Sequence, residues 1–140
     1  MTHTEARAFL KEHVKYRGGE ETIVTEQLVR YWWSVLNVAV FYGKLSKPIK
    51  VETKQLKGSF GEAEVNTKHK GRINIRLQNK FLSKCLFLTV LLHEMVHAWE
   101  HQHHTVMGHG KRFYAWKNRI KRTTGLDLDI SHDEDDYRYE

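Results

Sequence analysis

The sequence predicts an α+β fold in which helices pack on a small, mostly antiparallel sheet. Two helical segments come first, short alternating segments follow the single proline, Pro48, and two more helical segments close the chain. The 140 residues, 40% hydrophobic and with four tryptophans, are enough for one hydrophobic core. We therefore expect a single domain over residues 1–140, with an acidic C-terminal segment at 127–140.

Two helices are expected before Pro48. Thr2 and Glu5 have the spacing of a capping box, so a first helix is predicted to run to about Tyr16. A second helix begins near Thr25 and extends to Gly43. Its apolar residues recur at helical intervals, at Leu28, Trp32, Val35, Ala39 and Tyr42.

Three strands are expected in the middle of the chain. Residues 49–51 and 73–77 alternate between apolar and polar side chains, and residues 60–65 form a further candidate strand after Gly58. Residues 68–71 are typical of a turn and separate the last two strands.

Two helices are expected in the C-terminal half. Ser83 is placed to cap a helix whose first half is apolar nearly all round, so this helix should lie inside the domain. A last helix is predicted over residues 111–124, with Gly125 at its C-cap. Its expected inward residues are Phe113, Trp116 and Ile120, and its expected outward residues are Lys111, Arg112, Lys117, Arg119, Lys121 and Arg122.

The charge is unevenly distributed along the chain. The formal net charge is +6, yet residues 127–140 hold seven acids against Arg138, which leaves residues 1–126 at +12. This basic body favours a polyanionic partner, nucleic acid above all, bound without sequence preference and in a salt-sensitive way. An ordinary solvated surface is the alternative. The candidate DNA-binding residues are the six outward residues of the last helix, with a second group at Lys68, Lys70, Arg72 and Arg76. We also hypothesise that the acidic segment screens this surface.

Cysteine content and hydropathy bear on the compartment. One cysteine, Cys85, excludes an internal disulfide framework and a cysteine zinc ribbon. Residues 1–11 lack a secretory signal, and the apolar run 86–92 is far too short to span a bilayer. We expect a monomer that does not bind membranes and is cytoplasmic or otherwise intracellular, associated with the nucleoid or, in a eukaryote, with the nucleus.

Residues 93–97 read His-Glu-Met-Val-His. His93 and His97 are one helical turn apart, about 6 Å along the axis, so both imidazoles reach one zinc ion. Glu94 lies beside the metal, where it is the expected general base, and zinc lowers the pKa of a coordinated water to about 7. Shuffling this composition yields the pattern with a chance of roughly 6%, so its position on a core-facing helix is the stronger evidence, because buried polar groups need partners.

A third ligand is needed, and the chain offers alternatives. His109 is favoured because Gly108 and Gly110 flank it and allow the backbone to turn back toward the helix. His103 matches the longer metzincin pattern, although that pattern needs a glycine where this chain has Glu100. His101 overshoots the metal by a further helical turn, and His104 has no pattern behind it.

At these residues the chain resembles the SprT-like (Spartan) metalloproteases. The resemblance rests on residues 91–98 (LLHEMVHA), 108–113 (GHGKRF), 36–37 with 41–45 (LN, FYGKL), and 124–125 with 132–138 (TG, HDEDDYR). Residues 73–77 (INIRL) resemble the family's edge strand, and the likeness covers roughly residues 28–138.

What the resemblance implies is a zincin-like fold and cleavage of proteins attached to DNA. It also implies His93, His97 and His109 as zinc ligands and Glu94 as the catalytic residue. Family members commonly carry a cysteine zinc ribbon or another DNA-binding module after the protease core, and this sequence has no cysteines for such a ribbon.

Three further residues are candidates for stabilising the oxyanion of a scissile carbonyl: Tyr137 first, with His132 and Tyr114 as alternatives. Trp32, Trp33, Trp99 and Trp116 fall at helical spacings and are expected in the core rather than at a substrate surface. Trp33 is offset from the apolar face of its helix, so it is the first candidate for an exception that contacts substrate. The competing function is a non-catalytic, zinc-stabilised basic DNA-binding module. A third possibility is an adaptor that uses the fold without metal.

Overall fold

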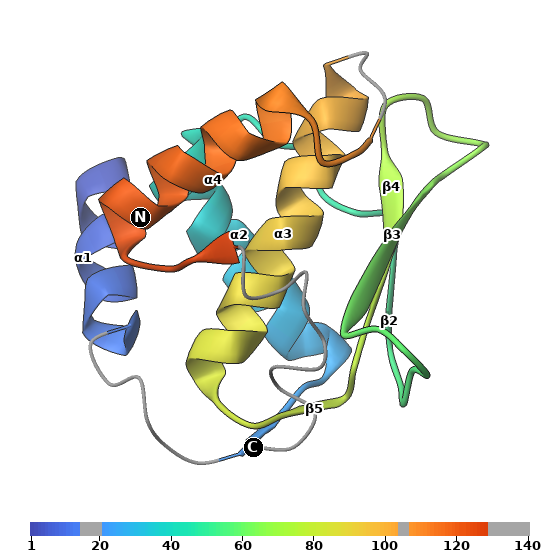
Figure 1. Ribbon diagram of the computed structural model, residues 1–140, viewed down its shortest axis with the longest axis horizontal. Coiled ribbons are helices and arrows are strands. Elements are labelled where there is room, and N and C mark those ends of the chain that lie inside the picture. The colour runs from blue at the N-terminus through green and yellow to red at the C-terminus, as the bar shows by residue number, and fades with distance from the viewer. Residues whose placement is uncertain (15–20, 104–106, 129–140) are drawn as a thin grey trace.

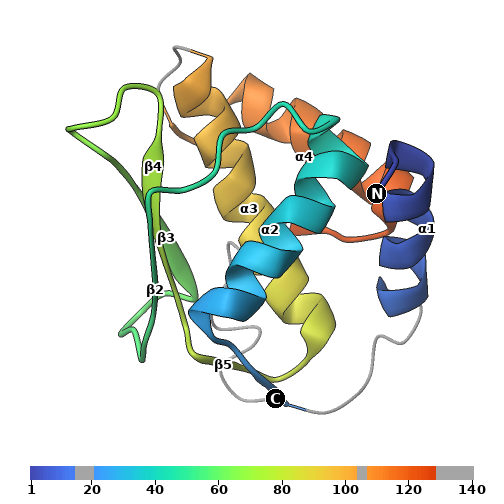
Figure 2. The same cartoon turned by 180° about the vertical axis from the view of Figure 1, so that it is seen from behind.

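The computed structural model describes residues 1–14, 21–103 and 107–128. Its helices are α1 (His3–Val14), α2 (Glu26–Phe41), α3 (Lys84–Gln102) and α4 (Lys111–Thr124). Helix α3 lies at the centre, with a three-stranded sheet on one side and α1 on the far side of the molecule (Figures 1 and 2). None of the described helices has the length and apolar character needed to cross a membrane.

The two N-terminal helices begin at their predicted caps. The Thr2 amide donates to Glu5 Oε1 at 3.0 Å and the Glu5 amide donates to Thr2 Oγ1 at 3.1 Å, which completes the capping box. In α2 the Leu28 amide donates to Thr25 Oγ1 at 3.2 Å. Tyr42 ends that helix in a left-handed conformation and is 59% exposed, so its expected place on the apolar face is wrong. The predicted end of the first helix at Tyr16 lies outside the described residues.

The main sheet contains β2 (Lys50–Thr53), β3 (Gly61–Val65) and β4 (Ile73–Leu77) in the order β2-β4-β3. Strand β3 is antiparallel to β4, whereas β2 is parallel to it, so this sheet is mixed. The expected edge position of residues 73–77 is wrong, because β4 is the central strand and β3 is an edge. Every second residue of β4 (Ile73, Ile75, Leu77) is buried, which explains its clean alternation.

A second, two-stranded antiparallel sheet joins β1 (Thr22–Ile23) to β5 (Lys80–Phe81). Neither strand was expected, because two residues are too few to show an alternating pattern. This sheet links the segment before α2 to the segment before α3.

Helix α3 forms the core of the domain. The Leu86 amide donates to Ser83 Oγ at 3.1 Å at its predicted N-cap, and residues 86–98 are all buried. Trp33 is only 2% exposed and belongs to the same core, as expected of the tryptophans in general, so its choice as the exception that contacts substrate is wrong. Its helix α2 is buried on a wider face than the residues at helical intervals indicated.

Helix α4 has the predicted bounds and orientation. Phe113, Trp116 and Ile120 are buried, while the six basic residues are exposed except for Lys117, which is half-buried. Gly125 ends the helix at a φ of 82°, a conformation that favours glycine. Leu128 beyond it is 0% exposed, so the chain re-enters the core after α4.

Candidate metal centre

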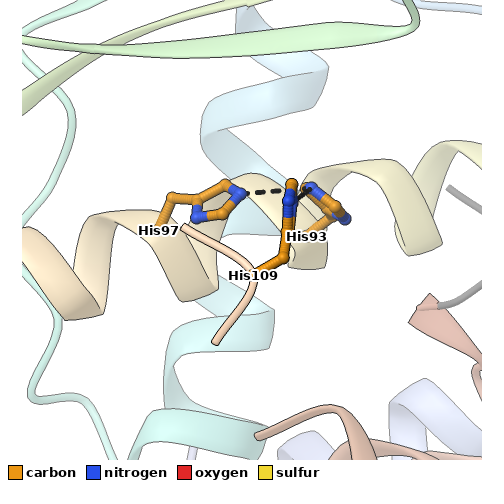
Figure 3. A group of neighbouring side chains, drawn as sticks. All are labelled: His93, His97 and His109. Atoms are coloured by element: carbon orange, nitrogen blue, oxygen red, sulfur yellow. Dashed lines mark hydrogen bonds between the residues drawn. The ribbon is translucent and has the colours of Figure 1, made fainter. Parts of the chain in front are cut away.

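Helix α3 places two imidazoles side by side. His93 and His97, one turn apart, are 7% and 9% exposed, and their Nε2 atoms lie 3.2 Å apart (Figure 3). Most other buried residues of this helix are apolar, whereas these two side chains line the pocket described below. The spacing of four residues between His93 and His97 in the sequence predicted this contact.

A third imidazole joins them from the turn that precedes α4. His109 Nε2 lies 3.2 Å from His93 Nε2, and the ligand atoms of the three histidines all lie within 4.8 Å of one another. In a tetrahedral zinc site with Zn–N distances of about 2.0–2.1 Å, ligand nitrogens are about 3.3 Å apart. The residues therefore fit a zinc ion, because one cation satisfies nitrogen lone pairs that otherwise face one another.

The other candidate third ligands do not join this group. His103 stacks on the Trp99 ring, with ring centroids 4.1 Å apart, and its Nδ1 contacts the Trp99 carbonyl oxygen at 2.9 Å. His101 lies half-buried on the last turn of α3, and the described residues that gather as a possible metal group are the three histidines 93, 97 and 109 alone. His104 lies outside the described residues.

A buried carboxylate orients the site. Glu100 Oε1 lies 2.9 Å from His97 Nδ1, and its side chain is 4% exposed. When Nδ1 donates its proton to Glu100, the lone pair of His97 remains on Nε2, which faces the other two imidazoles. The backbone amide of Gly108 also donates to Glu100 Oε1, at 3.4 Å, so the same carboxylate holds the turn that carries His109.

Phe113 forms the apolar floor of the triad. Its ring centroid lies 4.9, 5.3 and 4.8 Å from those of His93, His97 and His109. Because Phe113 is 0% exposed, it excludes water from that side of the histidines and restricts how the imidazoles rotate. Sequence reasoning assigned Phe113 to the core and did not connect it to the site. Its signal was its place four residues after His109 on the buried face of α4.

Glu94 is 6% exposed and lines the same pocket as the three histidines. Burial raises the pKa of its carboxyl to about 8, with the charge of Glu62 acting in the same direction. A divalent cation held by the triad would oppose this shift, because a nearby positive charge favours the carboxylate. Glu94 is thus placed to hold or release a proton in the pocket that the three histidines line.

The pocket has a volume of about 490 Å³ and opens to solvent at His109 and Glu62, both exposed. Its lining consists of Gly61, Glu62, Ala63, His93, Glu94, His97, Met107, Gly108 and His109. One wall is β3, and none of the described strands pairs with the outer edge of β3. Three of the predicted site residues and Glu94 therefore face an open groove beside a strand edge.

The remaining predicted site residues lie elsewhere. Tyr114 is 46% exposed, does not line this pocket, and has Lys117 Nζ 5.1 Å from its ring centroid. Tyr137 and His132 lie outside the described residues. In the second basic group, Arg76 pairs with Glu62 and Glu64, and Arg72 donates to the Lys47 carbonyl, whereas Lys68 and Lys70 are exposed.

Comparison with known proteins yields one match. The family model described as the SprT-like family matches residues 29–132, which is most of the chain. The match begins in α2 and includes the whole sheet of β2–β4, helix α3, the three histidines and α4. No curated protein matches the chain in sequence.

Proposed function

The chain belongs to the SprT-like family, and from this membership and the metal centre we propose that it is a zinc-dependent endopeptidase that cleaves proteins on or near DNA. The observation that carries the proposal is the convergence of three imidazoles and Glu94 on one open pocket. The family match supports a metalloprotease-like function in general, and the geometry of the pocket supports the individual roles proposed below.

His93, His97 and His109 would hold one zinc ion through their Nε2 atoms. A zinc ion in this position supplies Lewis-acid activation of water and of the scissile carbonyl. Glu100 keeps the His97 lone pair directed at the ion, and Phe113 keeps water from the opposite side of the triad.

Glu94 would be the general base. Its carboxylate accepts a proton from the attacking water and then donates that proton to the leaving amine. The buried position of Glu94 supports this role, because its carboxyl holds a proton more readily than an exposed one does.

Strand β3 is the proposed binding site for the substrate backbone. An extended peptide adds to a free strand edge by main-chain hydrogen bonds, which are largely independent of side-chain identity. The residues of β3 that line the pocket, Gly61, Glu62 and Ala63, would then place a scissile bond beside Glu94. We accordingly expect weak sequence preference.

The basic face of α4 supports a substrate on or near DNA. Lys111, Arg112, Arg119, Lys121 and Arg122 are all exposed on this helix, with Lys117 half-buried beside them. Phosphate contacts of this type are sequence-independent, so they would locate the enzyme on DNA without selecting a site.

The competing function is a non-catalytic, zinc-stabilised DNA-binding module, which the same basic face also favours. Structural zinc is normally enclosed by four protein ligands. Among the described residues three histidines gather, and Glu94 lines the open pocket beside them. Three histidines beside a carboxylate in an open pocket favour the enzymatic function over the structural one.

The test is Glu94→Gln, with Glu64→Gln as the matched control on β3. We expect Glu94→Gln to reduce casein cleavage at least about a hundredfold, as expected for loss of a general base, while zinc content and unfolding temperature stay unchanged. Glu64 is exposed and lies outside the pocket, so its variant should retain activity. Full activity of Glu94→Gln with zinc bound would exclude the proposed mechanism.

A further inference from the structure

A hollow beside α2 shares no lining residue with the metal pocket. It lies between α2 and the segment that connects α2 to β2, and we call it the α2 groove. Helix α2 and this connection face the viewer in Figure 2, whereas α2 lies behind α3 in Figure 1. The lining residues of the groove are Gln27, Arg30, Tyr31, Trp33, Ser34, Asn37, Val38, Gly43, Lys47 and Pro48. Neither the metal site nor the proposed peptide edge uses this surface.

The α2 groove is long and has the size of a ligand site. Its volume is about 670 Å³, within the range of roughly 300–1,000 Å³ typical of such sites. Along α2 it runs from Gln27 to Val38, which is about 16 Å at the helical rise of about 1.5 Å per residue. An extended peptide advances about 3.3 Å per residue, so a segment of about five residues spans this length. The dimensions therefore suit a short peptide segment.

The floor of the groove is mostly apolar. Trp33 and Pro48 are buried there, and Trp33 also belongs to the core of the domain. Val38 is half-buried, and Tyr31 is 48% exposed. An exposed tyrosine beside an apolar floor offers a contact for an apolar or aromatic side chain, which gains by leaving water. We therefore expect an occupant that brings at least one apolar side chain.

The indole N–H of Trp33 is buried and has no acceptor among the described residues. Other polar side chains of the lining already bond elsewhere. Asn37 exchanges two hydrogen bonds with the Leu45 backbone, at 2.8 and 3.0 Å. Ser34 Oγ donates to the Tyr31 carbonyl at 2.8 Å. A buried donor without an acceptor costs free energy, so an occupant with backbone carbonyls is favoured.

The charged residues that line the groove are both basic. Lys47 is exposed on the connection, and Arg30 is half-buried on α2. The Arg30 guanidinium donates to Glu26 at 2.8 Å. It also donates to the carbonyls of Pro48 and Ile49, at 3.4 and 3.3 Å. Because Glu26 offsets the charge of Arg30, Lys47 carries the net positive charge of the groove, which favours an occupant of opposite charge.

We propose that the α2 groove binds a short acidic segment of a partner protein. An apolar side chain of the segment contacts Tyr31 and Val38, and a carboxylate pairs with Lys47. A backbone carbonyl of the segment accepts from Trp33 Nε1. The inference goes beyond the proposed function, since docking at this groove needs neither zinc nor Glu94.

A nucleic acid strand is the other anionic occupant to consider. Its phosphates carry a charge at every nucleotide and are held by several cations along the strand. The groove offers only Arg30 and Lys47, and Arg30 is already paired with Glu26. Phosphates also gain nothing from an apolar floor, whereas a peptide combines a few charges with apolar side chains. The groove therefore favours an acidic peptide over nucleic acid.

The experiment follows the indole N–H signals of the ¹⁵N-labelled, zinc-loaded chain by NMR. The probes are two pools of end-blocked pentapeptides that share leucine, phenylalanine or tyrosine at the centre and carry either acidic or basic residues on both sides. We expect the acidic pool to shift the Trp33 signal, which is identified by its absence in Trp33→Phe. The acidic pool should bind at least about tenfold more tightly than the basic pool, because charge complementarity favours it.

Three results would overturn the proposal. The first is equal binding of the two peptide pools, and the second is a Trp33 signal that the acidic pool leaves unmoved. The third is a thymidine oligonucleotide that shifts the Trp33 signal as strongly as the acidic pool does, since the groove would then bind nucleic acid instead.

Two variants of equal charge locate the binding site. Lys47→Gln removes a cation that lines the groove, and Lys44→Gln removes an exposed cation of the same connection outside the groove. We expect a severalfold greater loss of acidic-peptide binding for Lys47→Gln. Ser34→Glu places a negative charge in the groove at an exposed helical position, so it should abolish binding without lowering the unfolding temperature. Equal losses for the two lysine variants, or full binding by Ser34→Glu, would contradict the groove.

Peptide binding at the α2 groove and casein cleavage at the metal pocket are separate measurements. Ser34→Glu should cleave casein like the wild type, because Ser34 does not line the metal pocket. Glu94→Gln should bind the acidic pool like the wild type. Binding that follows the groove variants in a chain without protease activity would overturn the enzyme and keep the groove. Protease activity that depends on Glu94, in a chain that does not distinguish the two pools, would do the reverse.

Discussion

Glu100 is the residue that connects the two halves of the metal site. It contacts His97 Nδ1 from within α3 and accepts the Gly108 amide from the turn that carries His109. Partners of this kind fix the orientation and raise the basicity of a ligating imidazole. One buried carboxylate thus acts on two of the three proposed ligands.

We predict that Glu100→Ala weakens zinc binding by about 10- to 100-fold, the usual effect of removing an outer partner of a metal ligand. Glu100→Gln should lose less, because its amide oxygen still accepts from Nδ1. The measurement is competition for zinc with a chelating dye. Glu12→Ala, at an exposed helical position of α1, is the control and should leave the affinity unchanged. Equal affinities for all three variants would remove Glu100 from the site.

The sequence could predict the residues of the site whose positions follow from local geometry. His93, Glu94 and His97 follow from helical spacing, and His109 follows from its flanking glycines. Glu100 and Phe113 were missed because their contacts with the histidines depend on how α3, α4 and the turn pack. Trp33 was wrongly singled out as an exception among the tryptophans for the same reason, since α2 is covered by neighbours on more of its circumference than its own apolar pattern showed.

At the scale of elements, the closeness of β3 to α3 forms the pocket wall. A side-chain Cβ at Gly61 would lie 2.6 Å from Leu77 Cδ2 and 3.1 Å from Val90 Cγ1, and both of these residues are buried. Glycine at this position lets the edge strand pack tightly beside the metal pocket.

Gly61→Ala is therefore expected to destabilise the fold by about 1–3 kcal/mol, the usual effect of overpacking a core. It should also lower protease activity, because β3 must shift away from Glu94. Gly108→Ala is the control: it lines the same pocket, has no heavy atom within 4 Å of its added Cβ, and should be tolerated. Urea unfolding and casein cleavage measure the two effects. Equal stability of the two variants would contradict the close packing.

Helix α1 is joined to α2 and α3 through His13. The His13 ring contacts the rings of Phe9 and Trp32, and its Nδ1 lies 3.0 Å from Lys84 Nζ. Burial, together with the charge of Lys84, lowers the pKa of His13, while Glu12 acts weakly in the opposite direction. The neutral imidazole is therefore the form that the folded protein favours.

The lowered pKa of His13 makes the free energy of unfolding depend on pH. Because the folded protein binds this proton less readily, the free energy of unfolding should fall as the pH drops below the ordinary histidine value of about 6.5. His13→Leu should remove this part of the loss. Urea unfolding near pH 7.5 and pH 5.5, compared between the two proteins, measures it, since the other histidines contribute equally to both. An identical loss in the variant would contradict the role of His13.

Local sequence patterns are sufficient to predict some of the helices and strands but not others. The four helices follow from caps and apolar spacing, with α4 at the predicted bounds, and β4 follows from alternation. The parallel pairing of β2 with β4 and the short strands β1 and β5 depend on contacts between distant segments. The edge position expected for residues 73–77 came from the family resemblance, and sequence periodicity carries no information on pairing that could have corrected it.

At the scale of the whole molecule, the acidic segment 127–140 and the rest of the chain carry net charges of opposite sign. The hypothesis that it screens DNA binding was framed for residues 127–140, but Leu128 is 0% exposed and belongs to the core. Ending the chain after Leu128 is the better test. That truncation removes six acidic residues and Arg138, so the formal net charge rises by five.

We predict that the chain ending at Leu128 binds DNA more tightly at low salt and that the difference shrinks as salt is added. Anisotropy titrations with a labelled oligonucleotide at several salt concentrations measure this, and the unfolding temperature shows whether the core is intact. Unchanged affinity in a truncated chain that remains folded would exclude screening by the segment.

The mixed order of the main sheet also bears on how the protein reaches its native state. Strands β3 and β4 are joined by a short connection. Strand β2 also pairs with β4, although β3 lies between the two in the sequence. Pairings between neighbouring segments form with little loss of chain entropy, and pairings across long intervals form slowly. We therefore expect the hairpin of β3 and β4, which borders the candidate metal pocket, to assemble during folding before β2 pairs with β4.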